Sequence, residues 1–191
     1  MSTRRDFLKT AAIAGAGMAT ATLANAAQKA PVIAPQKQRT PSKDGKIRVG
    51  FIGTGFRSQE HFNNVLSFPD ARVVAICDIS DFSLNMTKET FKRKGKEFPK
   101  IYKGGEHEFE KMLANEEFDV VLIASPWEWH VPMSVAAMKA GVPYVGVEVS
   151  AATNMDECWD LVNTSEETGS QLMILENVCY RRDVMAALKM V

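Results

Sequence analysis

Short apolar runs alternate with longer segments of mixed polarity from residue 46 to the end of the chain. The runs lie at 46–53, 72–78, 119–125, 143–149 and 171–177, with a weaker one at 100–102. Uninterrupted apolar runs of this length are typical of parallel strands that are covered on both faces. The segments between them predict helices at 56–67, 81–95, 106–115, 131–140 and 154–168, and another from residue 181 onward. Strands and helices that alternate with short links predict an α/β fold with a doubly wound parallel sheet and right-handed crossovers.

The first 26 residues have a different pattern. A charged start that contains Arg4 and Arg5 is followed by a small-residue apolar run and by Ala24-Asn25-Ala26, a small-x-small cleavage pattern. This order of segments predicts a secretory signal peptide over residues 1–26, which is removed and is no part of the fold. The twin arginines before Phe-Leu-Lys resemble a twin-arginine (Tat) signal. We therefore expect export through the Tat route to the periplasm or cell envelope, with no membrane span after signal removal.

Composition changes again after the signal. Residues 27–45 contain three prolines and several Lys and Gln residues, which predicts a solvated linker. The predicted sheet then forms one domain over residues 46–191. Its last helix is apolar and has neither a cap nor a stop signal before Val191, so we interpret the chain as truncated at residue 191.

The overall composition excludes several classes of function. A hydrophobic fraction of 46% can build a core. The 23 basic and 23 acidic residues cancel, so there is no electrostatic reason to expect nucleic acid or an anionic membrane as a partner. Three cysteines and three histidines are too widely spaced for a disulfide framework or a metal site, and we expect neither.

The first predicted strand ends in Gly53-Thr-Gly55-Phe-Arg-Ser58, the pattern G-x-G-x-x-G with serine at the third position. Gly53 permits a tight turn, and Gly55 lets the backbone approach a pyrophosphate at the start of the next helix. Arg57 offers that pyrophosphate a charge-assisted contact. Asp78 ends the next strand, where a carboxylate accepts from a ribose 2′-hydroxyl and repels a 2′-phosphate. These residues predict a Rossmann domain that binds NAD rather than NADP; the alternatives are a plain strand–helix turn and, for Asp78, a helix N-cap.

Further segments carry a family resemblance. The Gly53–Ser58 turn, Asp78, Ser125-Pro126 with His130, and Glu148 together resemble the Gfo/Idh/MocA oxidoreductase family. Its members join an N-terminal Rossmann domain to a C-terminal α/β domain that carries much of the substrate site, and that second domain is absent from this chain. Three longer segments resemble the N-terminal portion of the glycoside hydrolase family 109 branch, which consists of NAD-dependent α-N-acetylgalactosaminidases. They are Pro126-Trp-Glu-Trp-His130, Glu148-Val-Ser150 and Leu175-Glu-Asn-Val-Cys-Tyr-Arg-Arg-Asp183.

The resemblance implies cofactor contacts in the loops after successive strands. With the two motif glycines and Asp78, the expected NAD-binding residues are Gly53, Gly55, Phe56, Arg57, Asp78, Trp127, Glu128, Trp129, His130, Glu148, Val149 and Asn177. The two tryptophans offer flat apolar faces to the dinucleotide, the alternative being ordinary core or surface aromatics. His130 is suited to orient a hydroxyl, the alternative being a satisfied histidine at a helix start. Glu148 ends a buried strand, where an unpaired carboxylate is costly, so we expect it to face the cleft.

One departure from the broader family bears on the chemistry. Oxidoreductase members carry Glu-Lys-Pro where this chain has Glu148-Val149-Ser150, and that lysine acts as acid and base in hydride transfer. Valine has no titratable group, so a dehydrogenase that uses this lysine is disfavoured. In the resembled branch the acid and base lie in the C-terminal domain. The catalytic residues are therefore unknown here and are expected beyond residue 191.

The resemblance implies a glycosidase that removes terminal α-N-acetylgalactosamine by oxidation, elimination, addition and reduction. NAD takes a hydride from C3 of the sugar, a base then removes the proton at C2, and water adds after the leaving group departs. The expected partner is a glycan or glycoside containing N-acetylgalactosamine, and a homo-oligomer is possible. The alternatives are an exported NAD-dependent sugar dehydrogenase or oxidoreductase, and a non-catalytic NAD-binding protein. We expect the 191-residue segment alone to be inactive.

The twin arginines give a first prediction. Replacing both Arg4 and Arg5 by lysine should leave the protein in the cytoplasm, because the Tat signal is read through the arginine pair. Cell fractionation measures the result. Export that is unchanged in the double variant would contradict the Tat assignment.

Overall fold

The computed structural model describes residues 42–190. The predicted signal peptide and most of the predicted linker lie outside the described residues, as does Val191. The described part is built on one sheet of six parallel strands in the order β3-β2-β1-β4-β5-β6. The strands are β1 (Ile47–Ile52), β2 (Ala71–Cys77), β3 (Lys100–Tyr102), β4 (Val120–Ile123), β5 (Tyr144–Val147) and β6 (Gln171–Ile174). The prediction of a doubly wound parallel sheet is confirmed.

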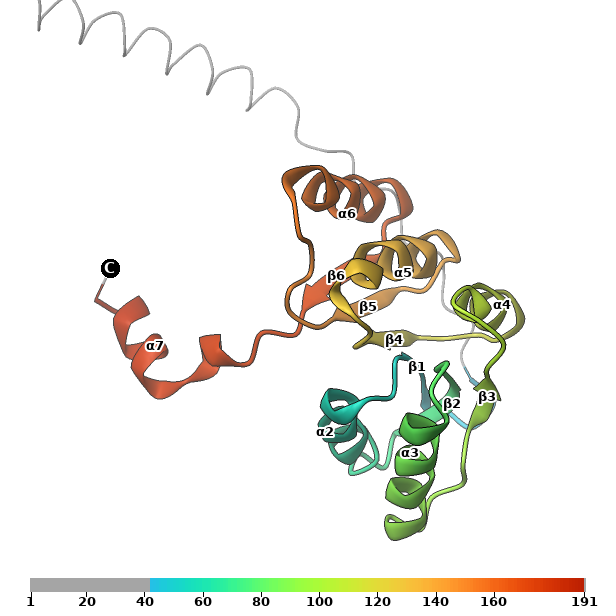
Figure 1. Ribbon diagram of the computed structural model, residues 1–191. Helices are drawn as coiled ribbons and strands as arrows, with labels where there is room; N and C mark the ends of the chain where they lie inside the picture. Colours follow the sequence, from blue (N-terminus) through green and yellow to red (C-terminus); the bar gives the residue numbers. More distant parts are fainter. Residues whose placement is uncertain (1–41, 191) are drawn as a thin grey trace, which may run out of the picture. The chain divides into compact units, whose positions relative to one another are not determined.

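Helices lie on both faces of this sheet (Figure 1). One face carries α2 (Phe56–Val65) and α3 (Asp81–Arg93), and the other carries α4 (Glu108–Asn115), α5 (Trp127–Lys139) and α6 (Met155–Thr168). A 3₁₀ turn, η1 (Val178–Tyr180), and α7 (Arg182–Leu188) follow β6. The change of face occurs where the chain passes from β3 to β4, so the strand order reverses between β1 and β4. In open sheets of this kind ligands bind at the carboxyl ends of the strands beside that reversal.

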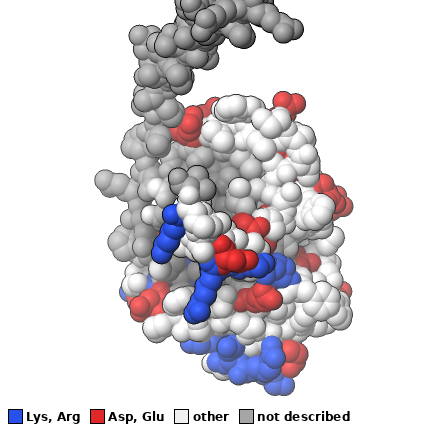
Figure 2. All heavy atoms as spheres, turned by 90° about the vertical axis from the view of Figure 1, so that its left-hand side faces the viewer, with Lys and Arg blue, Asp and Glu red and all other residues white. Residues whose placement is uncertain are grey.

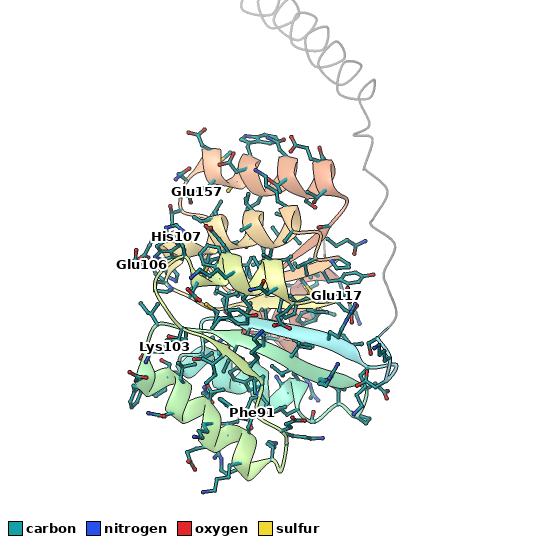
Figure 3. All side chains as sticks on the ribbon, turned by 90° about the vertical axis from the view of Figure 1, so that its right-hand side faces the viewer. Phe91, Lys103, Glu106, His107, Glu117 and Glu157 are labelled. Carbon is teal, nitrogen blue, oxygen red and sulfur yellow. The ribbon has the colours of Figure 1, made fainter. Side chains whose placement is uncertain are left out.

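Two apolar cores hold the helices to the sheet. Under α2 and α3 the rings of Phe51 and Phe62 stack with centroids 4.0 Å apart, and Phe91 meets Phe62 edge-on at 5.6 Å. Figure 3 shows Phe91 directed from α3 toward the sheet. The opposite core packs Met112 and Met138, both fully buried, against the other face. Because each core covers one face, the central strands β1, β2, β4 and β5 are largely buried, as their apolar runs predicted. The outer strands β3 and β6 are more exposed than their apolar runs predicted, because each stands at an edge of the sheet.

Helix α5 begins four residues earlier than predicted, at Trp127 instead of Val131. Pro126 is its N-cap, with an extended backbone that lets the helix start at once. Trp and His have modest helix propensities, but packing overrides them here: Trp129 meets Phe109 edge-on at 6.2 Å, and His130 is buried. The segment predicted as a loop after β4 is therefore the first turn of a helix.

Strand β6 is shorter than predicted and ends at Ile174 rather than at residue 177. Its neighbour β5 ends at Val147, and the backbone N–H of Leu175 donates to the carbonyl of Val147 as the last bond of that pair. Residues beyond this point have no strand to pair with, so the chain leaves the sheet and forms η1.

Charged side chains of both signs are interspersed on the face drawn in Figure 2, and a basic group stands at its lower end. The last turn of α3 carries Lys92 and Arg93, and positive charge is favourable beside a helix C-terminus. No helix among residues 42–190 combines the length and the apolar character needed to cross a membrane.

The aromatic core gives a second prediction. Phe62→Ala should lower the free energy of unfolding by about 3–5 kcal/mol, because it empties a fully buried site between two other rings. Phe82→Ala is the matched control: that ring is 66% exposed on α3, and its loss should change stability by about 0.5 kcal/mol or less. Denaturant unfolding of the chain measures both, and equal losses would contradict this assignment of the core.

Candidate functional site

A cleft of about 450 Å³ opens at the carboxyl ends of the strands. The loops that follow β1, β2, β3 and β4 all contribute to its walls. Of the residues predicted to bind a cofactor, Gly53, Gly55, Asp78 and Trp129 line it. The cleft therefore lies on the β2–β3 side of the strand reversal, where one half of a dinucleotide is expected.

The two motif glycines are suited to their positions for different structural reasons. Gly53 has φ +84°, and a Cβ added there would lie 2.6 Å from the carbonyl oxygen of Ala124. Gly55 has an ordinary backbone conformation, and a Cβ there would meet nothing within 4 Å. Gly53 is thus required by the fold itself. The open space at Gly55 lies at the cleft, which fits close approach by a ligand.

Serine at the third motif position forms a hydrogen bond within the turn. Ser58 is fully buried, and its hydroxyl donates to the carbonyl oxygen of Gly53 at 2.6 Å. The hydroxyl thus satisfies a backbone acceptor in the turn, and the small side chain still allows α2 to pack against β1. This hydrogen bond helps to hold the turn in place.

The N-terminus of α2 is unusual among the described α-helices. Its N-cap, Gly55, supplies no side-chain hydrogen bond, and no acidic residue lies in its first turn. By contrast, α3 and α6 are capped by Ser80 and Asn154, and each has an acid in its first turn. The backbone N–H groups at the start of α2 are therefore left to an anion, and the helix dipole favours negative charge there.

Asp78 is held in place by three hydrogen bonds. Its Oδ2 accepts from the backbone N–H of Thr54 at 2.6 Å and from the Thr54 hydroxyl at 2.8 Å, while Oδ1 accepts from the backbone N–H of Ser80 at 2.7 Å. Thr54 stands between the two motif glycines, and the sequence analysis missed its role. The bonds join the turn after β1 to the end of β2 and fix the carboxylate at the edge of the cleft.

The loop after β3 also belongs to the cleft, which the sequence analysis missed. Figure 3 shows Glu106 and His107 at the carboxyl ends of the strands and Glu117 at the opposite, amino ends. Glu106 lines the cleft together with Ile79, Trp129 and Met133. The strand order could have signalled this, because β3 lies beside β2 and its following loop must lie near Asp78. The apolar members form walls suited to a flat aromatic base.

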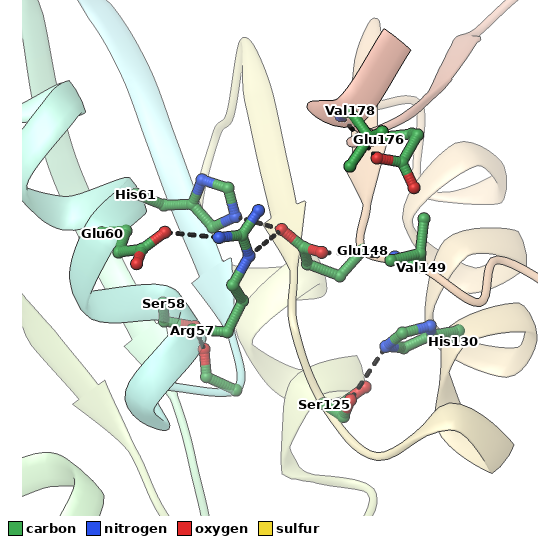
Figure 4. A network of polar contacts seen from close by, with 11 residues as sticks. Arg57, Ser58, Glu60, His61, Ser125, His130, Glu148, Val149, Glu176 and Val178 are labelled. Atoms are coloured by element: carbon green, nitrogen blue, oxygen red, sulfur yellow. Dashed lines mark hydrogen bonds and ion pairs between the residues drawn. The ribbon is translucent and has the colours of Figure 1, made fainter. Parts of the chain in front are cut away.

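Glu148 lies at the end of β5 in a second polar cluster, and it is paired rather than unpaired (Figure 4). Its Oε1 accepts from Nε of Arg57 at 2.7 Å and from Nε2 of His61 at 2.6 Å. Arg57 also pairs with Glu60. Burial raises the pKa of the Glu148 carboxyl, but the hydrogen bonds from Arg57 and His61 outweigh burial and bring it below the ordinary value. Arg57, expected on a pyrophosphate, is thus engaged with Glu148, and the carboxylate is held in its charged form.

The Trp127–His130 segment divides into outward and inward residues. Trp127 and Glu128 are exposed, whereas His130 is only 1% exposed. Nδ1 of His130 lies 2.6 Å from the carbonyl oxygen of Ser150, and Nε2 lies 2.8 Å from that of Ser125. The ring therefore ties the loop after β4 to the loop after β5. This supports the alternative of a satisfied histidine near a helix start, and a direct ligand contact stays a prediction.

The remaining predicted residues lie at the same edge of the sheet without lining the cleft. Phe56 is 76% exposed, and its ring lies 6.0 Å from that of Phe82. Val149 and Asn177 are exposed in the loops after β5 and β6. The structure thus gathers the predicted residues after β1, β2, β4, β5 and β6, and their contacts with a cofactor stay predictions.

Neither thiol nor metal chemistry is indicated near the cleft. Burial raises the pKa of the Cys77 thiol to about 12, so it is no thiolate nucleophile. Within the described ranges, no three His, Cys, Asp or Glu side chains gather closely enough to hold a metal ion.

Comparison with known proteins identifies the domain. The model of Gfo/Idh/MocA, the oxidoreductase family with an NAD-binding Rossmann fold, matches residues 47–176. The chain belongs to this family. The residues present fit the cofactor that this Gfo/Idh/MocA domain binds: a glycine turn with open space at Gly55, an uncapped helix N-terminus for the pyrophosphate, and Asp78 for a ribose. The predictions of a Rossmann domain and of NAD as its cofactor are confirmed.

Two curated relatives of this Gfo/Idh/MocA domain match over all of the chain. One is a glycosyl hydrolase family 109 protein from Parabacteroides distasonis, and the other is an alpha-N-acetylgalactosaminidase from Tannerella forsythia. Each is 62% identical to this chain. The chain spans 41% of the first relative and 42% of the second. The resemblance to the family 109 branch is therefore confirmed for the N-terminal part of these proteins.

Solved structures with the same fold are more distant in sequence. A WlbA dehydrogenase from Bordetella pertussis in complex with NADH and UDP-GlcNAcA superimposes with a TM-score of 0.64 at 23% identity, covering 75% of this chain and 41% of that one. A scyllo-inositol dehydrogenase from Lactobacillus casei with bound NAD(H) and scyllo-inositol gives 0.63 at 17%, covering 76% and 40%. At these identities the likeness establishes the fold.

Asp78 gives a third prediction. Asp78→Asn should weaken NAD binding by about 1–3 kcal/mol, the cost of losing a charged acceptor. It should also reduce the discrimination against NADP, because the charge that repels a 2′-phosphate is gone. Thr54→Val, which removes one hydroxyl bond but keeps the carboxylate, should retain the preference for NAD. Titration of both cofactors measures this, and equal affinities for NAD and NADP in the unchanged chain would contradict the assignment.

Proposed function

We propose that this domain is the NAD-holding part of an exported glycosidase that hydrolyses terminal α-N-acetylgalactosaminides. The observation that carries the proposal is the 62% identity, over the whole chain, to a relative named alpha-N-acetylgalactosaminidase. Since the chain spans 42% of that relative, the activity belongs to a longer protein of which this domain forms the N-terminal part. Its substrate is a glycan or glycoside that ends in N-acetylgalactosamine.

The residues at the end of β5 support a model in which this domain binds the cofactor and another part of the protein supplies the catalytic acid and base. Val149 follows Glu148 and is 42% exposed, so its position is open to a ligand but offers no proton donor or acceptor. The described residues at this end of β5 therefore suit binding and orientation, and the acid and base come from another part of the protein. A dehydrogenase that relies on a lysine at this position is disfavoured.

Bound NAD would supply reversible hydride acceptance, which makes a neighbouring C–H bond of the sugar acidic enough for elimination. The chain's own residues hold the cofactor for this purpose. The start of α2 binds the pyrophosphate, and Asp78 accepts from a ribose hydroxyl and disfavours a 2′-phosphate. A cofactor that is returned to its starting state in each turnover suits an exported protein, because it needs no outside supply.

The fourth prediction tests this chemistry in the complete protein. Cleavage of an aryl α-N-acetylgalactosaminide should proceed for many turnovers without added NAD, and product formed in heavy water should carry deuterium at C2 of the sugar. Mass spectrometry and NMR of the product measure this. Cleavage without deuterium at C2 would defeat the elimination route, and NADH formed in step with sugar oxidation, without cleavage, would favour a sugar dehydrogenase.

A matched variant ties the activity to the cofactor. A Cβ at Gly55 would meet nothing within 4 Å, so Gly55→Leu should leave the fold intact while its side chain occupies the space open to the pyrophosphate. This variant should lose both NAD binding and cleavage at unchanged thermal stability. Retained cleavage would show that the glycosidase reaction does not use this site.

A further inference from the structure

His61 of α2 belongs to the polar cluster around Glu148. Neither the glycine motif nor the family resemblance singled out this residue. Its Nε2 lies 2.6 Å from Oε1 of Glu148, and its side chain is 16% exposed. Because an ionised carboxylate can only accept hydrogen bonds, Nε2 of His61 carries the hydrogen. His61 therefore donates to the same oxygen that Arg57 reaches through Nε.

Both donors come from the helix that begins at the cofactor turn. Arg57 and His61 are four residues apart, so they project from the same face of α2, toward the end of β5 (Figure 4). Together they fix Oε1 of Glu148. Its Oε2 is 3.3 Å from the backbone N–H of Val149, a long bond that uses only one of the acceptor positions of this oxygen.

The strand order indicates which ligand group this oxygen meets. Asp78 follows β2 and Glu148 follows β5, and these two strands stand at equivalent positions on either side of the reversal between β1 and β4. A dinucleotide has a matching arrangement, because one ribose lies on each side of its pyrophosphate. Two carboxylates placed in this way fit one ribose each, with the pyrophosphate between them at the start of α2.

We propose that His61 is a positioning residue: with Arg57 it holds Oε1 of Glu148, so that Oε2 accepts from a hydroxyl of the second ribose of the dinucleotide. Loss of His61 thus weakens binding of the whole dinucleotide and spares binding of its ADP half. Arg57 then acts through Glu148 in the same way. The inference rests on the proposed function only in that the site holds an intact dinucleotide.

The test compares NAD with ADP, which lacks the second ribose. In the complete chain, His61→Leu should lower NAD affinity about tenfold and change ADP affinity by about twofold or less, as expected for the loss of one charge-assisted hydrogen bond. His61→Gln keeps an N–H donor and should restore most of the NAD affinity. Asn64→Leu, at an exposed position of the same helix, is the control and should change neither affinity.

A double-mutant cycle separates positioning from general stability. In a Glu148→Gln background, His61→Leu should produce little further loss of NAD affinity, because the two residues act as a unit. If His61→Leu does not fold, Glu148→Gln carries the test, since it must lower NAD affinity and leave ADP affinity unchanged. Equal losses for NAD and ADP, equal losses in the Leu and Gln variants, or no loss at all would overturn the inference. Cleavage is scored separately, so normal NAD binding without cleavage would overturn the proposed function alone.

Discussion

The close approach of two backbones at Gly53 determines the arrangement of the whole carboxyl edge. The turn after β1 lies so near the loop after β4 that a Cβ on Gly53 would lie 2.6 Å from the carbonyl oxygen of Ala124. These two strands flank the point where the strand order reverses. Because the turn is pressed against its neighbour, α2 starts directly above the reversal. Both polar networks then form around it, one through Thr54 to Asp78 and the other through Arg57 and His61 to Glu148.

The second network shows how a buried charge is tolerated. Glu148 is 5% exposed, and an isolated carboxylate in that position would be expensive. Two hydrogen-bond donors from α2 offset this cost, which is why its pKa falls despite burial. Such a pair is weak evidence for added stability, since hydrophobic side chains often replace buried ion pairs without loss. Its value lies in fixing the direction of one carboxylate oxygen.

Much of the fold could be predicted from the sequence, because the apolar runs, the glycine turn and the acid after β2 depend on local spacing. The features that the sequence did not reveal depend on contacts between distant parts of the chain. Helix α5 starts early because Trp129 packs against Phe109 from α4. Arg57 pairs with Glu148, which lies 91 residues away, and no local pattern could have indicated this. His61 was missed for the same reason, whereas the loop after β3 could have been found from the strand order alone.

The three anchors on Asp78 bear on how long a ligand stays. Because Thr54 and Ser80 already hold the carboxylate, the acceptor is in place before anything binds. A ligand that meets a prearranged acceptor does not have to order the loop, so less conformational entropy is lost on association. The smaller entropy loss makes binding tighter, and tighter binding appears mostly as a slower rate of dissociation. A site of this kind is suited to a prosthetic group that stays bound, rather than to a coenzyme that is exchanged between turnovers.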